Sequence, residues 1–403
     1  MTLVLLAKGV LFAGLFVAAY TYVLYPLLLL ALAAGRQMRS DIGHATGGTG
    51  HPNRARRTGP ADPATLPSVA VLVAAFNEER HIGERLRNLL ASDYPADKLR
   101  VMVGSDGSSD ATNALVQQQL GPRVQLMAFT QRRGKPSVIN DLAAAASADI
   151  LVFTDANTSF ERDTIKSLVR HFADPTIGCV SGELRLVAAD GSDNPDHLYW
   201  RYERMLKFFE NRLGALLGAN GGVYALRRAQ YEPIAGDTIV DDFCIAAGLM
   251  LKGLRCHYDP QARASEETPP RLADEFGRRV RIGMGNYQAL RRFAGLMHPR
   301  RGYVALAFVS HKLMRWFVPH ALVLAFVANL LLLGQGPVYV ALAAAQSVFY
   351  AGALWGWVAG RRGAVPRLAR LPVFFTSMNL ALLVGHVRYL RGGFTGTWAR
   401  SSR

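Results

Sequence analysis

The chain has 403 residues, half of them hydrophobic, and a formal net charge of +16 at pH 7. This length is enough for one soluble domain and several membrane spans, and a purely soluble protein rarely combines such apolarity with such basicity. An excess of Lys and Arg is typical of proteins that bind nucleic acid, an anionic membrane surface or a phosphorylated substrate. Because the sequence has no zinc-knuckle spacing and no basic patch interleaved with aromatics, we expect no nucleic-acid partner. The three scattered cysteines indicate reduced thiols in a cytosolic domain.

The first 35 residues predict a retained membrane anchor. Residues 3–34 are almost continuously apolar, which is long enough to cross a bilayer and too long for a signal-peptide core. Arg36 and Arg39 follow at once, so the positive-inside bias places this flank in the cytoplasm and the amino terminus outside. Residues 36–67, rich in Gly, Pro and Arg, predict a basic linker.

From residue 68 the sequence alternates between strand-like and helix-like segments. Apolar runs at 69–75, 99–104, 124–129 and 150–154 are typical of buried strands, and amphipathic segments separate them. This alternation predicts an α/β domain with a Rossmann-like, mostly parallel sheet. The sequence has neither a GxGxxG nor a P-loop, so it supports no dinucleotide site and no Walker ATPase.

Polar residues follow the strand at 150–154. Asp155 and Asn157 would lie at its carboxyl end, where open α/β sheets bind their ligands, so a nucleotide and its metal are expected there. The alternative is that Asp155 caps a helix that begins near Ser159.

Two further polar groups stand at predicted helix entrances. Asp106 ends the second strand, and its carboxylate suits a nucleobase or ribose, although a simple turn would explain the same residues. Arg132, Arg133 and Lys135 surround Gly134 and suit a diphosphate; the alternative is a solvated basic turn.

Asp241 and Asp242 interrupt an apolar run. Adjacent carboxylates there are costly to bury unless they bind cations or share a proton. One of the two is therefore a candidate general base with a raised pKa.

The order and spacing of these groups resemble the family 2 glycosyltransferases, in the membrane-anchored branch of the cellulose, hyaluronan and poly-N-acetylglucosamine synthases. The resemblance covers about residues 67–319 and implies a GT-A domain over 68–300. The matching segments are Ala75–Glu79, Asp106–Asp110, Arg133–Lys135, Thr154–Asn157, Gly218–Arg228 and Asp241–Asp242.

The resemblance also assigns roles to individual residues. It implies that Asp106 contacts the base and ribose of a nucleotide sugar, and that Asp155 and Asn157 hold Mg²⁺ or Mn²⁺ at the diphosphate. Asp242 would deprotonate the acceptor hydroxyl, with Asp241 beside it. The remaining implied residues are Glu78, Arg133 and Lys135 for the donor, Asn220, Gly221 and Arg278 for the acceptor, and Arg281 for the leaving diphosphate.

The chain departs from the family pattern at two places. Asn157 stands where the family usually has a second Asp, which leaves a neutral metal ligand. Arg278–Ile282 replaces the Gln-x-x-Arg-Trp of the processive enzymes, so the aromatic platform for the sugar is absent there. Phe276 and Tyr287 are the alternative aromatics.

The carboxyl-terminal third predicts membrane association. Residues 301–316 predict an interfacial amphipathic helix, 317–392 about three membrane segments and 393–403 a basic tail. One amino-terminal and three later spans would place the tail outside, whereas its arginines favour the inside. Either the last segment is re-entrant or interfacial, or the number of spans is wrong.

These expectations define an inverting glycosyltransferase of the cell membrane, multi-pass, with a cytoplasmic catalytic domain. It would transfer a sugar from a nucleotide-diphosphate sugar, with a UDP-sugar as the expected donor, to a growing cell-surface polysaccharide. Two alternatives stay open: transfer to a lipid, as in ceramide glucosyltransferase, and a non-catalytic nucleotide-binding subunit of a secretion complex.

Overall fold

The computed structural model describes residues 2–45, 65–187, 197–267, 272–363 and 365–392. They form two compact units, which are described separately. The sheet unit contains Leu29–Pro270 and Arg291–Ala307, and the helical unit contains Met1–Leu28, Arg271–Leu290 and Phe308–Gly393, each within the described ranges.

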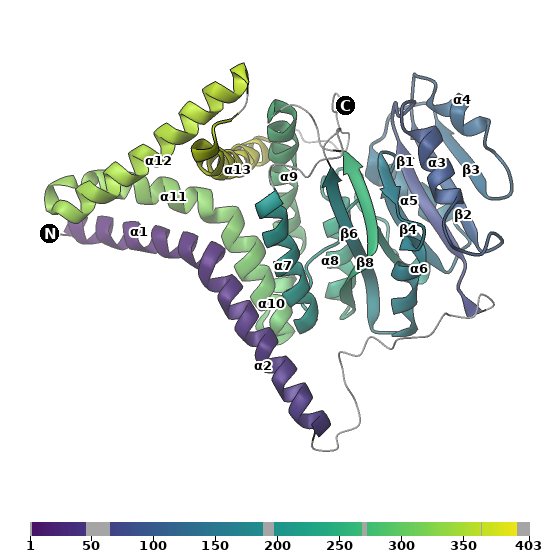
Figure 1. Ribbon diagram of the computed structural model, residues 1–403, viewed down its shortest axis with the longest axis horizontal. Helices are drawn as coiled ribbons and strands as arrows, with labels where there is room; N and C mark the ends of the chain where they lie inside the picture. The colour runs from purple at the N-terminus through teal and green to yellow at the C-terminus, as the bar shows by residue number, and fades with distance from the viewer. Residues whose placement is uncertain (1, 46–64, 188–196, 268–271, 364, 393–403) are drawn as a thin grey trace. The chain divides into compact units, whose positions relative to one another are not determined.

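The sheet unit is built on one mixed sheet with the strand order β3-β2-β1-β4-β7-β6-β8-β5 (Figure 1). Parallel pairing joins β3, β2, β1 and β4, and the antiparallel strand β7 separates β4 from β6. The predicted α/β, mostly parallel sheet is confirmed, with an antiparallel insertion. The strands are β1 (Val69–Ala75), β2 (Leu99–Asp106), β3 (Val124–Phe129), β4 (Ile150–Asp155), β5 (Thr158–Phe160), β6 (Ile177–Val187), β7 (Tyr224–Arg227) and β8 (Arg255–Glu267).

Helices cover both faces of this sheet because its central strands are apolar on both sides. Every residue of β1 is buried, and Val71 and Val73 share a core cluster with Ile82 and Leu86 of one helix. On the opposite face Gly104 lets another helix approach, because a Cβ there would lie 2.3 Å from Val138. The helices of this unit are α3 (Ile82–Leu90), α4 (Thr112–Gln117), α5 (Lys135–Ala145), α6 (Thr164–Val169), η3 (Arg170–Ala173), α7 (His197–Leu213), η4 (Arg228–Gln230), α8 (Asp241–Leu251), η5 (Ala294–Met297), η6 (Pro299–Arg301) and α10 (Tyr303–Ala307).

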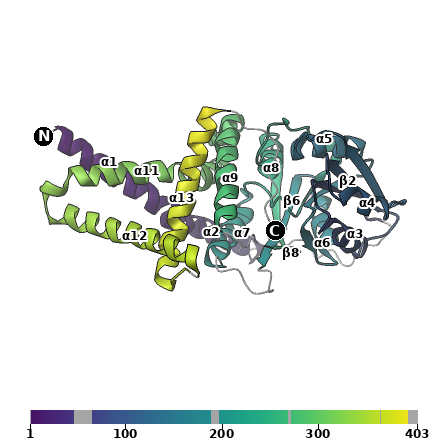
Figure 2. The same ribbon diagram turned by 90° about the horizontal axis from the view of Figure 1, so that it is seen from above.

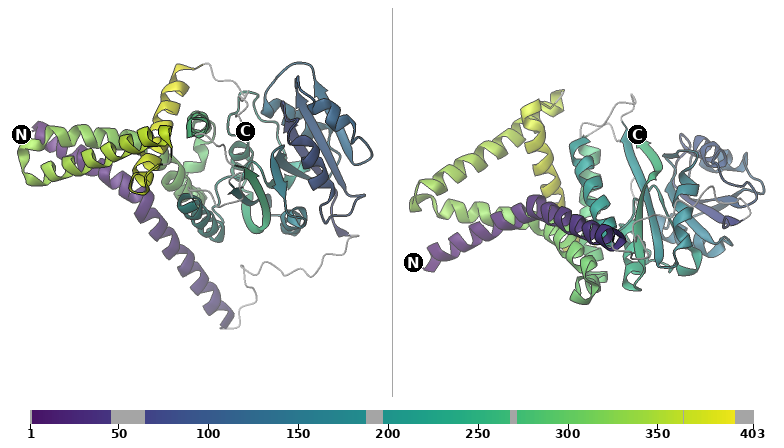
Figure 3. Two further views of the ribbon diagram at one scale, coloured as in Figure 1. Left: turned by 45° about the horizontal axis from the view of Figure 1, so that its top comes forward. Right: turned by 60° about the horizontal axis from the view of Figure 1, so that its bottom comes forward.

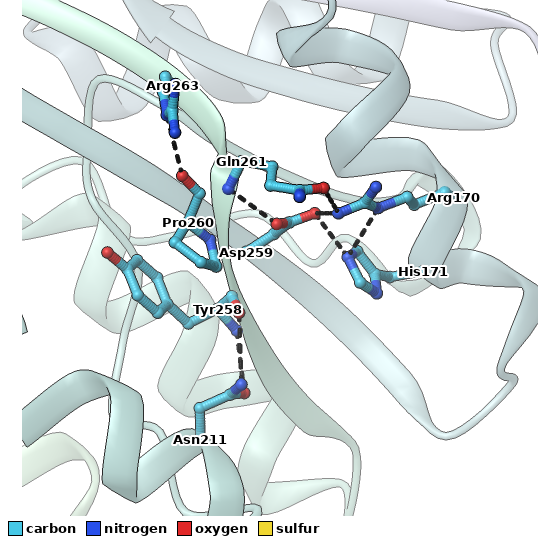
Figure 4. Close-up of polar contacts among 8 residues, drawn as sticks. All are labelled: Arg170, His171, Asn211, Tyr258, Asp259, Pro260, Gln261 and Arg263. Atoms are coloured by element: carbon cyan, nitrogen blue, oxygen red, sulfur yellow. Dashed lines mark hydrogen bonds and ion pairs between the residues drawn. The ribbon is translucent and has the colours of Figure 1, made fainter. Parts of the chain in front are cut away.

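A buried carboxylate fixes β8 against η3, the turn that follows α6 (Figure 4). Asp259 accepts hydrogen bonds from Arg170 at 2.6 Å and from the backbone N–H of Gln261 at 2.9 Å, and it lies 2.7 Å from Nε2 of His171. Burial disfavours the charge of Asp259, but the His171 and Gln261 hydrogen bonds and the neighbouring cation hold its pKa below the ordinary value. The contacts of Asp259 therefore hold the fold together.

A long helix begins near the amino terminus. It runs through α1 (Thr2–Ala19), the π-helical turn η1 (Tyr20–Leu24) and α2 (Tyr25–Ala45), and its residues up to Leu28 belong to the helical unit. Gly14 allows α1 to approach α11 (Met314–Leu331) closely, because a Cβ there would lie 2.6 Å from the carbonyl oxygen of Ala321. Such small-residue contacts are typical of membrane helix pairs.

The other helices of this unit run in two directions. Helices α1 and α11 run side by side and α12 (Pro337–Arg362) diverges from α11, whereas α13 (Arg367–Arg391) lies across α12 and beside α9 (Leu272–Arg292) (Figures 2 and 3). The contact between α9 and α13 is close, since a Cβ on Gly385 would lie 2.8 Å from the carbonyl oxygen of Val280. Helix α9 carries several arginines and is not apolar enough to cross a bilayer.

Two predicted segments differ from the structure. Helix α2 continues to Ala45, so the first part of the predicted linker is helical because its residues continue the anchor without a proline after Pro26. The predicted interfacial helix 301–316 is not separate: α10, the π-helical turn η7 (Phe308–Leu313) and α11 form one helical stretch from Tyr303 to Leu331. Residues 46–64 of the linker and the tail 393–403 lie outside the described residues.

Four helical stretches in the described part of the chain are long and apolar enough to cross a membrane. They are Thr2–Ile42, Tyr303–Leu331, Pro337–Arg361 and Arg367–Arg391.

Candidate active site

The carboxyl ends of β1 and β2 are tied together by hydrogen bonds. Asn77 has a positive φ of 55°, and its Oδ1 accepts from the backbone N–H of Ser109 at 2.8 Å. The backbone N–H of Glu78 donates to Thr112 Oγ1 at 2.8 Å. The predicted donor residue Glu78 and the turn after Asp106 are thereby brought together at one edge of the sheet.

Asp106 is fully buried and organises the loop that precedes α5. Its Oδ1 accepts from the backbone N–H of Arg133 at 2.7 Å, and its Oδ2 accepts from that of Gly134 at 2.8 Å. Gly134 has a φ of 94°, a conformation that favours glycine. The carboxylate therefore sets the position from which Lys135 extends, and its contact with a base and ribose stays a prediction.

Lys135 joins two of the predicted acids. Its Nζ lies 2.8 Å from Asp155 Oδ1 and 3.3 Å from Asp241 Oδ2. Burial lowers the pKa of Lys135, but the attraction of these carboxylates outweighs that effect and raises the pKa above its ordinary value. Arg133 points elsewhere, because its guanidinium pairs with Asp141 and lies 4.0 Å from the centre of the Phe129 ring.

Asp241 and Asp242 open α8. Asp242 Oδ1 accepts from the backbone N–H of Phe243 at 2.7 Å, and a Cβ on Gly221 would lie 3.2 Å from Asp242 Oδ2. Burial, together with repulsion from Asp241, raises the pKa of Asp242 to about 6, although Lys135 opposes the shift. A carboxyl group of this kind is ionised near neutral pH and still basic enough to take a proton.

Asp155 does not cap a helix. After Asp155 the chain turns into strand β5, and the next helix, α6, begins only at Thr164. The capping alternative is therefore wrong, because Ser159 pairs with β8 in the sheet. The side chain of Asp155 is 34 % exposed and open to a ligand. Asn157 donates from Nδ2 to Glu266 Oε1 at 3.2 Å.

Asn220 is held inside the sheet unit. Its Nδ2 donates to the carbonyl oxygen of Gly182 at 2.5 Å, its backbone N–H donates to Ser181 Oγ at 3.0 Å, and Lys207 donates to its Oδ1. These bonds fix the loop that brings Gly221 next to Asp242. Acceptor binding by Asn220 stays a prediction.

The remaining predicted residues belong to the helical unit. Arg278 and Arg281 lie on α9, and Arg278 forms a two-point ion pair with Glu275 at 2.9 and 3.0 Å. Tyr287 is 3 % exposed, stacks on His386 with ring centres 4.0 Å apart and donates to the carbonyl oxygen of Trp316. A buried ring cannot stack on a sugar, so Tyr287 does not replace the missing aromatic platform.

The donor set for a metal is small. Among the described residues, no three or more His, Cys, Asp or Glu side chains gather in a way that could hold a metal ion. The partly exposed carboxylate of Asp155 and the amide of Asn157 are nevertheless oxygen ligands. They fit a divalent cation that takes its other ligands from phosphates and water, as Mg²⁺ commonly does.

Arg85 was missed by sequence reasoning. It is 2 % exposed and donates to Thr154 Oγ1 at 2.6 Å, next to Asp155. An Arg on an amphipathic helix normally indicates a solvated face. Its spacing places it next to Leu86 and one turn before Leu89, on the buried side, and that position was the only available signal.

A comparison with solved structures supports the fold. A mannosyltransferase from Pyrobaculum calidifontis, solved with GDP-Man and Mn²⁺, aligns with a TM-score of 0.67 over 91 % of this chain and 97 % of that chain, at 24 % identity. Together with the acids at the strand ends, this likeness identifies the sheet unit as a GT-A type domain.

The sequence comparisons identify the family. The model of the glycosyltransferase like family 2 matches residues 67–285. The β-monoglucosyldiacylglycerol synthase of Synechocystis sp. is 28 % identical over 211 residues, which are 48 % of this chain and 42 % of that protein. The poly-β-1,6-N-acetyl-D-glucosamine synthase of Staphylococcus aureus is 26 % identical over 251 residues, which are 59 % of each. The chain thus spans about half the length of these relatives, and it belongs to glycosyltransferase like family 2.

Proposed function

We propose that the protein transfers a sugar from a nucleotide-diphosphate sugar, in particular a UDP-sugar, to a growing polysaccharide, with inversion at the anomeric carbon. The observation that carries this proposal is the arrangement of Lys135 between Asp155 and Asp241, with Asp242 next in the chain. It combines a cation, an open carboxylate and a weakly acidic carboxyl group in one site.

The donor half of the reaction needs positive charge. As the bond to the anomeric carbon breaks, negative charge grows on the leaving nucleoside diphosphate. Lys135 supplies a fixed cation, and Asp155 and Asn157 would hold Mg²⁺ or Mn²⁺, which neutralises phosphate charge when bound. Asp106 keeps the backbone of Arg133 and Gly134 in place at the entrance of α5, from which Lys135 extends.

The acceptor half needs a base. A pKa of about 6 leaves Asp242 ionised at neutral pH, so its carboxylate can accept the proton of the attacking hydroxyl. Gly221 has no side chain to crowd Asp242 Oδ2. One displacement from the side opposite the leaving group inverts the configuration. Arg281 is proposed to act on the leaving diphosphate, and Arg278 with Asn220 on the acceptor.

The membrane setting supports an acceptor that stays at the bilayer. The four long apolar helices suit a multi-pass protein, and Arg36 and Arg39 favour a cytoplasmic sheet unit by the positive-inside rule. We propose the cell membrane as its location. The similarity to a poly-N-acetylglucosamine synthase supports a polysaccharide product.

A lipid acceptor is the second candidate. Two observations favour it: residues 278–282 contain no aromatic side chain for a sugar chain, and one relative is a glycolipid synthase. A diacylglycerol-based acceptor would need no platform for a polymer.

One experiment separates these functions. Membranes that contain the full chain are incubated with radiolabelled UDP- and GDP-sugars, and label is followed into insoluble polymer and into organic solvent. Label in polymer supports the main proposal, and label in solvent supports the lipid acceptor. No label from any donor would refute both and favour a non-catalytic nucleotide-binding subunit.

The matched variants are Asp242→Asn and Asp237→Asn. Asp237 lies in the loop before α8 and has a 45 % exposed side chain that pairs with Arg292. Asp242→Asn should keep nucleotide binding and lose at least about a hundredfold in transfer, the range of a general base, whereas Asp237→Asn should resemble wild type. Turnover retained by Asp242→Asn would contradict the base assignment.

A further inference from the structure

A positively charged side chain lies buried beneath the Asp155 turn. Arg85 of α3 is 2 % exposed, and its side chain is flanked by the Phe160 ring, whose centre lies 4.2 Å from the guanidinium carbon. Burial lowers the pKa of Arg85 to about 9, and Asp155 opposes that shift by attraction. Burying a cation costs free energy unless hydrogen bonds or nearby anions compensate its charge.

The guanidinium holds one end of the segment that carries the predicted metal ligands. Its Nη2 donates to Thr154 Oγ1 at 2.6 Å, one residue before Asp155. Its Nη1 donates to Asn88 Oδ1 at 2.6 Å, one turn further along the same helix.

Asn88 holds the other end of that segment. Its Oδ1 accepts from the backbone N–H of Phe160 at 2.9 Å, and its Nδ2 donates to the carbonyl oxygen of Phe160 at 2.9 Å. Arg85 and Asn88 therefore fix residues 154 and 160, and the turn with Asp155 and Asn157 lies between these two points.

The same network reaches the loop beside the candidate base. Thr154 Oγ1 accepts from Arg85 and donates to the carbonyl oxygen of Gly222 at 2.8 Å. Gly221, the residue before it, is the one that approaches Asp242. The hydroxyl of Thr154 thus links the donor side to the acceptor side of the site, in addition to Lys135.

We propose that Arg85 is a positioning residue of the transfer site, which sets the Asp155–Asn157 turn for a divalent metal and nucleoside diphosphate and couples it to the Gly221–Gly222 loop. This inference rests on the proposed function. Arg85 is not a catalytic residue, since its side chain is covered by the protein and touches Thr154, Asn88 and Phe160.

The central variants are Arg85→Met, Arg85→Lys and Arg87→Met. Arg87 lies on the same helix but is exposed, so it controls for loss of an Arg from α3. Arg85→Met is expected to lower kcat/KM about a hundredfold, because small displacements of reacting groups cost about that much. Arg85→Lys, which keeps the charge, should recover about tenfold of this loss, and Arg87→Met should leave kcat/KM unchanged.

A binding measurement tests the same point without turnover. Calorimetric titration of UDP in the presence of Mn²⁺ should show affinity weakened about tenfold in Arg85→Met and unchanged in Arg87→Met. If Arg85→Met destabilised the protein but left the Asp155–Asn157 turn in place, it would show a lower Tm with normal UDP affinity, and that result would overturn the proposal.

Thr154→Val keeps the test decisive if Arg85→Met does not fold. Valine preserves the shape of Thr154 and removes only the hydroxyl that joins Arg85 to Gly222. We expect a loss of about tenfold in kcat/KM with a cooperative unfolding transition. Wild-type kinetics and UDP affinity in Thr154→Val, and in Arg85→Met if it folds, would refute the positioning role. A wild-type protein that binds UDP and Mn²⁺ but transfers no sugar would instead refute the proposed function.

Discussion

The pH dependence of transfer tests the assignment of Asp242 most directly. Its pKa of about 6 lies above the ordinary value of 3.8, and that difference corresponds to about 3 kcal/mol against ionisation. A base must be ionised to accept a proton, so kcat/KM should be constant above pH 6 and fall about tenfold for each pH unit below it. Initial rates at low donor concentration between pH 4.5 and 8 give this profile.

The fall in kcat/KM below pH 6 is the acidic limb of the profile, and two neighbouring charges should move this limb in opposite directions. Asp241 raises the pKa of Asp242, so Asp241→Asn should shift the limb to lower pH. Lys135 lowers the pKa of Asp242, so Lys135→Met should shift the limb to higher pH, whatever either variant does to the plateau. A limb that stays at pH 6 in both variants, or moves the same way in both, would refute the electrostatic account.

Three further outcomes are expected for Asp242, Asn157 and the carboxyl terminus. Asp242→Asn should stabilise the protein at pH 7 by up to about 3 kcal/mol, measured by denaturant titration, because the raised pKa of Asp242 costs stability progressively from the ordinary value of 3.8 to the folded value of about 6, and that cost is complete at pH 7. Asn157→Asp should tighten Mn²⁺ binding in a calorimetric titration, because it adds a carboxylate, and activity that survives exhaustive chelation would contradict the metal assignment. A reporter fused after Arg403 should be active on the cytoplasmic side; an extracellular signal would show that α13 crosses the membrane.

The four strands β1 to β4 could be predicted because their signals are local. The apolar runs of β1 and β4 are buried on both faces, so their sequences alone indicate central parallel strands. Strands β5, β6 and β8 were not predicted, and neither was the antiparallel strand β7. Its four residues, Tyr224–Arg227, carry too little pattern, and only tertiary contacts insert it between β4 and β6.

The sequence singles out the acids and Lys135 of the candidate site, but not Arg85. A carboxylate that ends or interrupts an apolar run stands out, as Asp155 does at the end of β4 and Asp242 does at the start of α8. Arg85 gives no comparable signal, since one Arg among several on α3 becomes special only when the fold buries it. The different directions of Arg133 and Lys135 likewise depend on the backbone that Asp106 holds.

The contacts of α13 bear on the charge conflict at the carboxyl terminus. Four membrane spans would place the tail outside, although Arg388 and Arg391 favour the cytoplasmic side. Helix α13 lies across α12 and packs against α9 through Gly385 (Figure 2). Because α9 carries too many charges to enter the hydrocarbon, a helix in close contact along it belongs at the membrane surface. We therefore expect three spans, with α13 in the interface and both basic ends of α13 on the cytoplasmic side.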